Sequence, residues 1–439
     1  MTNVALVVLD TLRKDAFDRH FDWLPGRRFD RAYSTSNWTV PSHASLFTGR
    51  YPSEVGVHAK NLYFDCETPA LAEELRDAGY TTRAFSANTN VSSHFDFDRG
   101  FDAFAAPEGM DYLNDENQFN WKEFNRTTDS TGVEKYLRAL YACIRDDSAT
   151  IPSLKTGFDL LRKDAPTEYG GATDALELIR GTEFGDREFL FLNLMEAHEP
   201  YRAPPEYRTV EEPDLTNSVG DISIGEVDGE RTKRAYEDCV RYLSDIYREM
   251  FEHLSEEFDY VITLSDHGEL LGEHGAWGHE YGVYPKLTHV PFVVSGEGLS
   301  GRSSAAASIL DAHGTIQALA DVDGESRGRN LLEPPSDGEF LAEYRGLTSW
   351  GKEKLKTNGY ETEAESYDRE LRGYVAPRDY YGFETLDGVE RVGSADAPDA
   401  AAVTDRIRRL RDDLDTRDVE RNNDVPDEIK DRLEDLGYA

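Results

Sequence analysis

Short runs of apolar and β-branched residues recur along the chain, and segments with helical spacing separate them. Continuous apolar runs are typical of strands that are buried on both faces of a parallel sheet. The spacing predicts helices at Ala70–Ala78 and Thr232–His253. Strands that alternate with helices indicate an α/β fold, a doubly wound and mostly parallel sheet with helices on both faces. The predicted strands are Val4–Leu9, Thr81–Ser86, Phe189–Leu194, Tyr260–Leu264 and Pro291–Val294.

The pattern changes at two places, which divide the chain into parts. We expect a main α/β domain over residues 1–340, in which residues 111–166 form an insertion near the functional site. The insertion is rich in Asn, Asp and Thr at first and then has helical spacing. Residues 341–439 are expected to form a small C-terminal antiparallel α+β subdomain. Its predicted strands and charged helices are Gly373–Ala376, Tyr380–Glu384, Glu390–Val392, Ala400–Leu414 and Asp427–Leu436.

The chain is strongly acidic, with a net charge of −38 over 439 residues, while 38% of its residues are hydrophobic. A chain this apolar is not disordered, so its acidic groups are expected on a folded surface. Such a surface is similar to those of proteins from organisms with molar internal salt, where self-repulsion is screened within about 3 Å. The alternative is an ordinary acidic protein. In either case the charge disfavours nucleic acid and anionic membranes as partners.

Cysteines and targeting signals carry little information here. Cys66, Cys143 and Cys239 are far apart and lack metal-ligand spacing, so they are interpreted as buried small residues. The chain opens directly into the strand Val4–Leu9, without a basic segment or a cleavage site. No stretch approaches the roughly 18 apolar residues of a membrane span. We therefore expect a cytoplasmic protein that does not bind a membrane.

The segment Ser36–Arg50, which reads SNWTVPSHASLFTGR, is the most informative part of the chain. Pro41 fits the first position of a helix, because its missing N–H would lack an intrahelical partner there. Thr39 is therefore predicted near a helix N-terminus. Free N–H groups and the helix dipole favour an anion there, or a nucleophile that loses its proton.

Two of the predicted strands end in candidate metal ligands. Asp10 follows the strand that ends at Leu9, and Asp266 and His267 follow the strand that ends at Leu264. The carboxyl ends of parallel strands meet at one crevice, where ligands bind. The three side chains are therefore expected around one metal ion, with Thr39 supplied by the loop before its helix. A single Asp after a strand is usually only a cap, so the prediction depends on the whole set.

The segment Thr39–Arg50 resembles the sulfatase signature, nucleophile-x-Pro-Ser-x-x-x-Leu-x-Thr-Gly-Arg. The resemblance to the sulfatase and alkaline phosphatase-like superfamily spans most of residues 2–330. The chain is identified as a haloarchaeal-type member of the sulfatase family with Thr at the formylglycine position. This implies an alkaline phosphatase/sulfatase-like fold. Further matching segments are Gly79–Thr82, Arg99–Asp102, Met195–Tyr201, Ser265–Gly275, Gly278-His279 and Leu433–Tyr438.

The resemblance also implies the roles of residues around Thr39. Asp10, Asp266 and His267 match the family's metal ligands, and Thr39 matches the nucleophile that also touches the metal. These donors suit one divalent ion, Ca²⁺, Mg²⁺ or Mn²⁺, and Leu194 stands where two-metal members have an Asp. The resemblance implies that His198 and His279 bind the anion and donate a proton. It also implies that His43 takes the place of an Arg that braces the nucleophile. Asn88 and Asn90 are the implied substrate-binding residues.

The resemblance therefore implies a hydrolase of sulfate, phosphate or phosphonate esters, in which Thr39 attacks the S or P centre. Formylglycine is not expected, because oxidation of Thr would give a ketone and not an aldehyde. A phosphodiesterase or a phosphoryl-type transferase with a covalent phospho-Thr is one alternative, and an inactive sulfatase-like scaffold is another. The substrate is expected to be a small-molecule or glycan ester, and the oligomeric state stays open.

Overall fold

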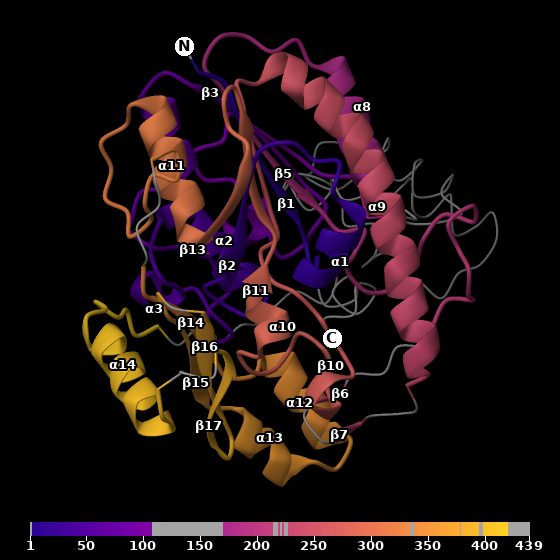
Figure 1. Cartoon of the computed structure of the whole chain (residues 1–439), viewed down its shortest axis with the longest axis vertical. Helices are drawn as coiled ribbons and strands as arrows, with labels where there is room; N and C mark the ends of the chain where they lie inside the picture. The colour runs from indigo at the N-terminus through magenta and orange to yellow at the C-terminus, as the bar shows by residue number, and fades with distance from the viewer. Residues whose placement is uncertain are drawn as a thin grey trace, which may run out of the picture.

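The computed structural model describes residues 2–107, 170–213, 218–219, 222–223, 227–333, 338–377, 379–394 and 398–419. Within these residues the central sheet has nine strands in the order β11-β2-β12-β8-β1-β5-β3-β4, and β13 pairs with β2. Figure 1 shows the helices around this sheet and a smaller sheet at the lower left. The nine strands are β1 (Val4–Leu9), β2 (Arg27–Tyr33), β3 (Thr81–Ser86), β4 (Ala103–Ala105), β5 (Glu188–Leu194), β8 (Tyr260–Leu264), β11 (His289–Val290), β12 (Phe292–Gly296) and β13 (Gly301–Ser308).

The middle of the central sheet is parallel and buried. Strands β8, β1, β5 and β3 lie side by side in parallel, and every residue of β1 and β5 is buried. Strand β12, predicted at Pro291–Val294, is antiparallel to both β8 and β2. The predicted fold class, a mostly parallel sheet in an α/β protein, is confirmed. The predicted bounds of β1, β3 and β8 are those observed.

Helices cover both faces of the sheet. Thr263 of β8 is in register with Val7 and shares a hydrogen bond with Tyr247 of α9, so this face of the sheet meets α9. Phe191 of β5 points to the opposite face, where its ring centroid lies 4.9 Å from that of Phe47 of α2. One layer therefore contains α1 (Lys14–His20), α8 (Ala172–Gly181) and α9 (Gly229–Glu257), and the other contains α2 (Thr39–Thr48), α4 (Leu71–Asp77) and α11 (Leu310–Ala320).

Helix α2 starts two residues earlier than predicted. Trp38 is its N-cap and Thr39 its first residue, so Pro41 occupies the third helical position and not the first. Proline is tolerated there, because the first four N–H groups of a helix have no intrahelical partner. The helix ends at Gly49, whose φ is 63°. A Cβ at Gly49 would lie 2.8 Å from Nδ1 of His313 on α11, so glycine is needed at this close approach.

A second sheet, antiparallel throughout, has the order β14-β15-β16-β17. Three of its strands were predicted in part, and β14 was not predicted. The predicted helix Asp427–Leu436 and the insertion 111–166 lie outside the described residues. The elements of this region are β14 (Phe340–Arg345), α12 (Ser349–Thr357), α13 (Glu361–Tyr367), β15 (Glu370–Val375), β16 (Tyr380–Thr385), β17 (Gly388–Gly393) and α14 (Ala400–Asp412).

Strand β14 joins this sheet to the segment that leads to Thr39. The N–H of Glu343 donates to the carbonyl oxygen of Thr35 at 2.7 Å, and the Ser36 hydroxyl donates to the carbonyl oxygen of Glu343 at 2.8 Å. The remaining helices are α3 (Pro52–Val55), α10 (Pro285–Thr288) and the short 3-10 helices η1 (Ser93–Phe95) and η3 (Glu273–Gly275). A small sheet contains β7 (Ile222–Ser223), β6 (Ser218–Val219), β10 (Trp277–Gly278) and β9 (Leu270–Leu271).

Among the described residues, no helix has both the length and the apolar character that a membrane crossing requires. Cys66 and Cys239 are buried free thiols, in agreement with their interpretation as small buried residues. Cys143 lies outside the described residues.

We expect the folded state to need high salt. The chain has 86 Asp and Glu residues against 48 Lys and Arg residues, so its surface charges repel one another in dilute buffer. Raising KCl from about 0.1 M to about 3 M shortens the screening length from about 10 Å to below about 3 Å. We expect the melting temperature to rise by about 10 °C or more. Differential scanning fluorimetry over a series of KCl concentrations measures this. A melting temperature that is independent of KCl contradicts the prediction.

Candidate active site

Three buried side chains meet where β1 and β8 end. Asp10 follows β1, Asp266 and His267 follow β8, and the ligand atoms of the three residues lie within 4.8 Å of one another. His267 Nε2 is 3.5 Å from Asp10 Oδ1 and 3.4 Å from Asp266 Oδ2. All three side chains are fully buried. The structure therefore brings the three predicted metal ligands together, as expected where parallel strands end.

Hydrogen bonds fix the direction of these donor atoms. His267 Nδ1 lies 2.9 Å from the carbonyl oxygen of Gly268, so Nδ1 carries a proton and Nε2 faces the two carboxylates. Asp266 Oδ1 accepts from the backbone N–H groups of Thr11 and His267, at 3.3 and 2.9 Å. Its buried Oδ2 accepts no hydrogen bond from the described residues. A buried carboxylate oxygen in this state is costly unless a cation binds it, so Asp10, Asp266 and His267 fit a divalent ion.

The two carboxyl groups influence each other strongly. Burial and the negative charge of Asp10 raise the pKa of Asp266 well above its ordinary value. Burial also acts to raise the pKa of Asp10, but neighbouring histidines, His267 first, and a hydrogen bond from Asn88 hold that pKa below its ordinary value. Without a cation, the site therefore favours one protonated carboxyl. A bound divalent ion would remove this penalty and favour both carboxylates.

Thr39, the predicted nucleophile, lies at the edge of this cluster. Its Oγ1 is 3.2 Å from His267 Nε2 and 3.4 Å from Asn88 Nδ2, and the side chain is fully buried. As the first residue of α2, it lies where helix N–H groups and the helix dipole favour negative charge. The loop before it is held by Asn37, whose Nδ2 donates to the carbonyl oxygen of His279 at 2.6 Å.

Asn88 and Asn90, predicted as substrate-binding residues, follow β3 and differ in their contacts. Asn88 Nδ2 donates to Asp10 Oδ2 at 2.8 Å and also faces Thr39 Oγ1, so Asn88 bridges the metal cluster and the nucleophile. Asn88 Oδ1 accepts from the backbone N–H of Asn90 at 2.9 Å. The Asn90 amide is buried, and neither of its side-chain atoms has a hydrogen-bond partner among the described residues. Asn88 therefore positions other groups, while Asn90 offers a donor and an acceptor.

His43 lies one helical turn after Thr39, on the core side of the carboxylates. Its Nδ1 is 2.9 Å from the carbonyl oxygen of Thr39 and 3.5 Å from Asp266 Oδ2. Burial lowers its pKa to about 4, so the ring is neutral near pH 7. Its contacts are with the backbone of Thr39 and with Asp266, which supports a bracing role.

His198 and His279 face each other beside the metal cluster. Their ring centroids are 5.0 Å apart, and the His279 ring is 4.6 Å from that of His267. Burial and the nearby His279 lower the pKa of His198 to about 4. Burial and the nearby His267 lower the pKa of His279 well below its ordinary value. Both imidazoles are therefore neutral near pH 7.

Glu269 is a site residue that the sequence analysis did not assign. Its buried carboxyl holds His279, with Oε1 at 3.1 Å from His279 Nδ1, and its Oε2 accepts from the Tyr201 hydroxyl at 3.0 Å. Burial raises the pKa of Glu269 to about 7. This pair fixes the orientation of the His279 ring. The only signal in the sequence was the position of Glu269, two residues after the predicted ligand His267.

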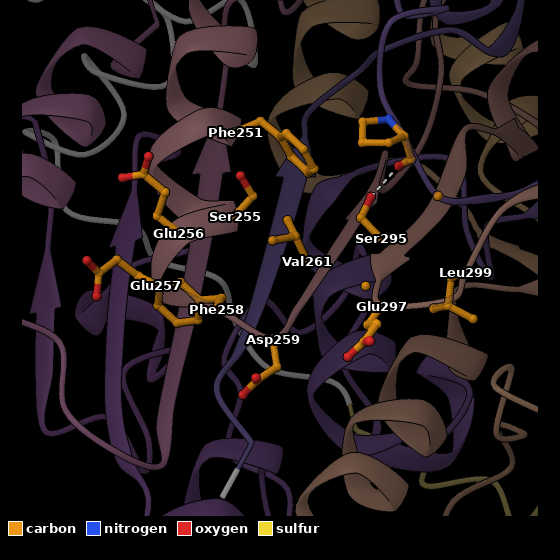
Figure 2. A pocket seen from close by; sticks show the side chains of 13 residues that line it. Phe251, Ser255, Glu256, Glu257, Phe258, Asp259, Val261, Ser295, Glu297 and Leu299 are labelled. Carbon is orange, nitrogen blue, oxygen red and sulfur yellow. Dashed lines mark hydrogen bonds between the residues drawn. The ribbon is translucent and has the colours of Figure 1, made fainter.

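A cavity of about 470 Å³ lies at the opposite end of the central strands, away from this cluster (Figure 2). It lies where β8 begins and β12 ends, because these strands are antiparallel. Cavity size therefore does not locate the candidate site. The side chains around this cavity include Phe251, Phe258 and Val261 and the acidic Glu256, Glu257, Asp259 and Glu297.

The family model named Sulfatase matches residues 3–322 of the chain. The chain belongs to the sulfatase family. The matched region runs from β1 to α11 and includes Asp10, Thr39, Asp266 and His267, so sulfatase-family membership and the candidate site occupy the same part of the chain. A search of curated proteins gives no match.

Solved structures with the same fold include enzymes of two kinds. One is a phosphonate monoester hydrolase from Silicibacter pomeroyi, with a TM-score of 0.64 and 19% identity over 95% of this chain and 96% of that one. The phosphonate monoester hydrolase of Agrobacterium radiobacter has a TM-score of 0.62 and 17% identity, over 94% and 95% of the chains. A 2-O GAG sulfatase has a TM-score of 0.59 and 14% identity, over 99% and 94%. At these identities the likeness shows the sulfatase and alkaline phosphatase-like fold.

Proposed function

We propose that this sulfatase-family protein is a metal-dependent hydrolase of phosphonate, phosphate or sulfate esters, with Thr39 as its covalent nucleophile. The observation that carries the proposal is the position of Thr39 Oγ1, in contact with His267 Nε2 and Asn88 Nδ2 at a helix N-terminus. A divalent ion held by Asp10, Asp266 and His267 would lower the pKa of the nucleophile and withdraw charge from the ester oxygens. Solved structures of this fold include hydrolases of phosphonate monoesters and sulfatases, which supports these ester classes.

The proposed reaction has two displacements. Thr39 Oγ attacks the P or S atom, and the bond to the alcohol oxygen breaks. A neutral imidazole, His198 or His279, takes the Thr39 proton and donates it to the departing oxygen. Water then attacks the Thr39 ester and gives one proton to the same imidazole, which returns it to Thr39 Oγ as the acid is released. Asn88 holds the nucleophile in place, and Asn90 binds an oxygen of the ester.

Thr39 favours phosphonate and phosphate esters over sulfate esters. Sulfatases release sulfate through the hydrated aldehyde of formylglycine, and the methyl group of Thr closes this route. The Thr39 ester must therefore be hydrolysed by water at the P or S centre. A transferase would use the same Thr39 ester with an alcohol in place of water.

We also propose a division into domains near residue 340. The antiparallel sheet starts at β14, beyond the region matched by the family model, which supports this division. The insertion 111–166 stays a prediction, as does the cytoplasmic location.

A panel of 4-nitrophenyl esters tests the proposed function. The panel contains a sulfate, a phenylphosphonate, a phosphate and a phosphodiester, each assayed in high KCl with Mg²⁺, Ca²⁺ or Mn²⁺. We expect the phosphonate or phosphate ester to be turned over at least about tenfold faster than the sulfate, and chelation to lower the rate by about 100-fold or more. A protein that binds the metal and turns over no ester of the panel would support the inactive scaffold instead.

A further inference from the structure

Thr11, which directly follows the candidate ligand Asp10, has a backbone conformation that threonine rarely adopts. Its φ is 63°, and the N–H of Leu12 donates to the carbonyl oxygen of Leu9 at 3.2 Å, so Thr11 is the third residue of a four-residue turn. Glycine and asparagine are preferred where φ is positive in a turn, because a branched Cβ crowds the backbone there. The backbone of Thr11 is therefore strained, and such strain is typical of positions whose side chain has a function.

The hydroxyl of Thr11 is bonded to a candidate metal ligand. Thr11 Oγ1 is fully buried and donates to Asp10 Oδ1 at 2.8 Å, and Asn88 Nδ2 donates to Asp10 Oδ2 at the same distance. Asp10 Oδ1 is also the oxygen that lies 3.5 Å from His267 Nε2. The two donors fix the plane of the Asp10 carboxylate. Each oxygen keeps a second lone pair, so these hydrogen bonds are compatible with a bound cation.

The backbone of Thr11 contacts the second candidate carboxylate. Its N–H donates to Asp266 Oδ1 at 3.3 Å, so Thr11 bonds one carboxylate at the end of β1 and another at the end of β8. Two buried carboxylates repel each other, and hydrogen bonds to their charged forms oppose this effect. Thr11 therefore links Asp10 and Asp266 before an ion binds them.

Tyr236 of α9 supports the turn that contains Thr11. Its buried hydroxyl donates to the carbonyl oxygen of Thr11 at 3.2 Å and accepts from the N–H of Arg13 at 2.9 Å. Its ring centroid lies 5.4 Å from that of Tyr201, in an edge-to-face arrangement that limits movement of the ring. The left-handed conformation of Thr11 is thus held by α9, a helix that carries none of the three candidate ligands.

We propose that Thr11 is a positioning residue of the metal site and that Tyr236 holds Thr11 in place. The Thr11 hydroxyl keeps the Asp10 carboxylate turned toward the ion that Asp266 and His267 would also bind. The inference rests on the metal site of the proposed function. It deepens that function, because it names residues that set the affinity for the ion without binding it. Removal of a contact that orients a ligand side chain typically lowers metal affinity about 10- to 100-fold.

Substitution of Thr11 tests the role of its hydroxyl. Thr11→Val keeps the branched shape and loses the donor to Asp10 Oδ1. Calorimetric titrations in high KCl are run with Mg²⁺, Ca²⁺ and Mn²⁺, and the variants are compared on the ion that binds the wild type most tightly. We expect Thr11→Val to raise the Kd about tenfold or more, and Thr11→Ser, which keeps the hydroxyl, to stay within about threefold of the wild type. An unchanged Kd in Thr11→Val, or an equal rise in Thr11→Ser, overturns the role of the hydroxyl.

Melting temperatures in EDTA separate positioning from a general structural role. Without an ion, Thr11→Val loses one buried hydrogen bond, so its melting temperature should fall by no more than about 4 °C. A residue that only supports the fold would lower the melting temperature and leave the Kd of the folded protein unchanged, which is the result that contradicts positioning. If Thr11→Val does not fold, the test passes to Tyr236→Phe, which changes no atom of the cluster.

Tyr236→Phe keeps the ring and removes the hydroxyl that bonds Thr11 and Arg13. We expect the Kd for the ion to rise about fivefold, because the Thr11 turn is then less well held. Tyr247→Phe is the matched control. Tyr247 is also fully buried on α9, and its hydroxyl shares a hydrogen bond with Thr263 of β8, so the control loses a similar bond away from Thr11. An unchanged Kd in Tyr236→Phe, or the same rise in Tyr247→Phe, overturns the role of Tyr236.

The same titrations distinguish this inference from the proposed function. If the wild type binds one ion per chain and turns over no ester, the proposed hydrolase fails, while a raised Kd in Thr11→Val still supports the inference. If Asp266→Asn loses the ion and Thr11→Val binds it as tightly as the wild type, the metal site stands and the role of Thr11 is refuted. If the wild type binds none of the three ions, the ligand set and the inference are both refuted.

Discussion

Thr39→Ala is expected to lower kcat/KM by about 10³-fold or more on the best substrate, because it removes the oxygen that forms the covalent ester. Helix α2 should persist, since Ala is a strong helix former and Trp38 still caps the helix. Metal content should also persist, because Asp10, Asp266 and His267 are unchanged. Thr39→Ser keeps the hydroxyl and should retain part of the activity. Steady-state kinetics and metal analysis of the same preparations measure these effects.

The matched control for this prediction is Thr48→Ala, at the other end of the same helix. Thr48 is buried, and its hydroxyl donates to the carbonyl oxygen of Ala44 at 2.7 Å. Its loss should cost about 1 kcal/mol of stability and leave kcat/KM nearly unchanged. Mass spectrometry of quenched turnover should show a phosphoryl-sized adduct on the peptide that contains Thr39. Near-wild-type activity of Thr39→Ala would mean that water attacks the ester directly.

The sequence predicted the buried strands of the sheet better than its polar ones. Strands β1 and β8 are continuous apolar runs, and the predicted bounds are those observed. Strand β2 reads RRFDRAY and β13 reads GRSSAAAS, so neither has an apolar run or a clean alternation. They form strands because β2 pairs with β12 and β13. Such pairing depends on tertiary contacts, which local patterns do not contain.

The candidate site also contains residues that the sequence predicts and one that it does not. Asp10, Asp266, His267 and Thr39 were predicted because each lies at the end of a strand or at the start of a helix, positions that a sequence pattern reveals. The structure places their side chains together, while their chemical roles stay proposals. The hydrogen bond between Glu269 and His279 was not predicted, because the two residues lie on either side of irregular turns, which have no periodic sequence pattern.

The approach of the C-terminal region to His279 was also invisible in the sequence. Trp350 comes from the first turn of α12, more than 300 positions after Trp38, yet both line one cavity. Their proximity follows from the hydrogen bonds between β14 and the segment Thr35-Ser36. No sequence pattern relates these two segments, so only the three-dimensional structure reveals that they line one cavity.

Asp266→Asn is expected to lower the metal content from about one ion per chain to below about 0.1, with the fold intact. The Asn side chain keeps Oδ1 as the acceptor for the N–H groups of Thr11 and His267, but it replaces Oδ2 with an amide that does not bind a cation. The variant should also lack the stabilisation that a bound ion gives the wild type, about 2.7 kcal/mol when the ion is present at 100 times its dissociation constant. Elemental analysis after dialysis measures the metal, and thermal melts with and without EDTA measure the stabilisation.

The thermal melts also show whether Asp266 binds a metal ion or only supports the fold. In EDTA the wild type holds Asp10 and Asp266 close together without a cation, which disfavours ionisation of both carboxyl groups, and Asp266→Asn removes this penalty because its amide carries no charge. The variant should therefore melt at or above the temperature of EDTA-treated wild type, although it binds no metal. The control Asp238→Asn changes a buried carboxylate on α9 that accepts from Thr209, and it should keep the metal. If Asp266→Asn retains a full metal ion, the ligand set is wrong. If it melts well below the EDTA-treated wild type, Asp266 supports the fold through its hydrogen bonds and not through a cation.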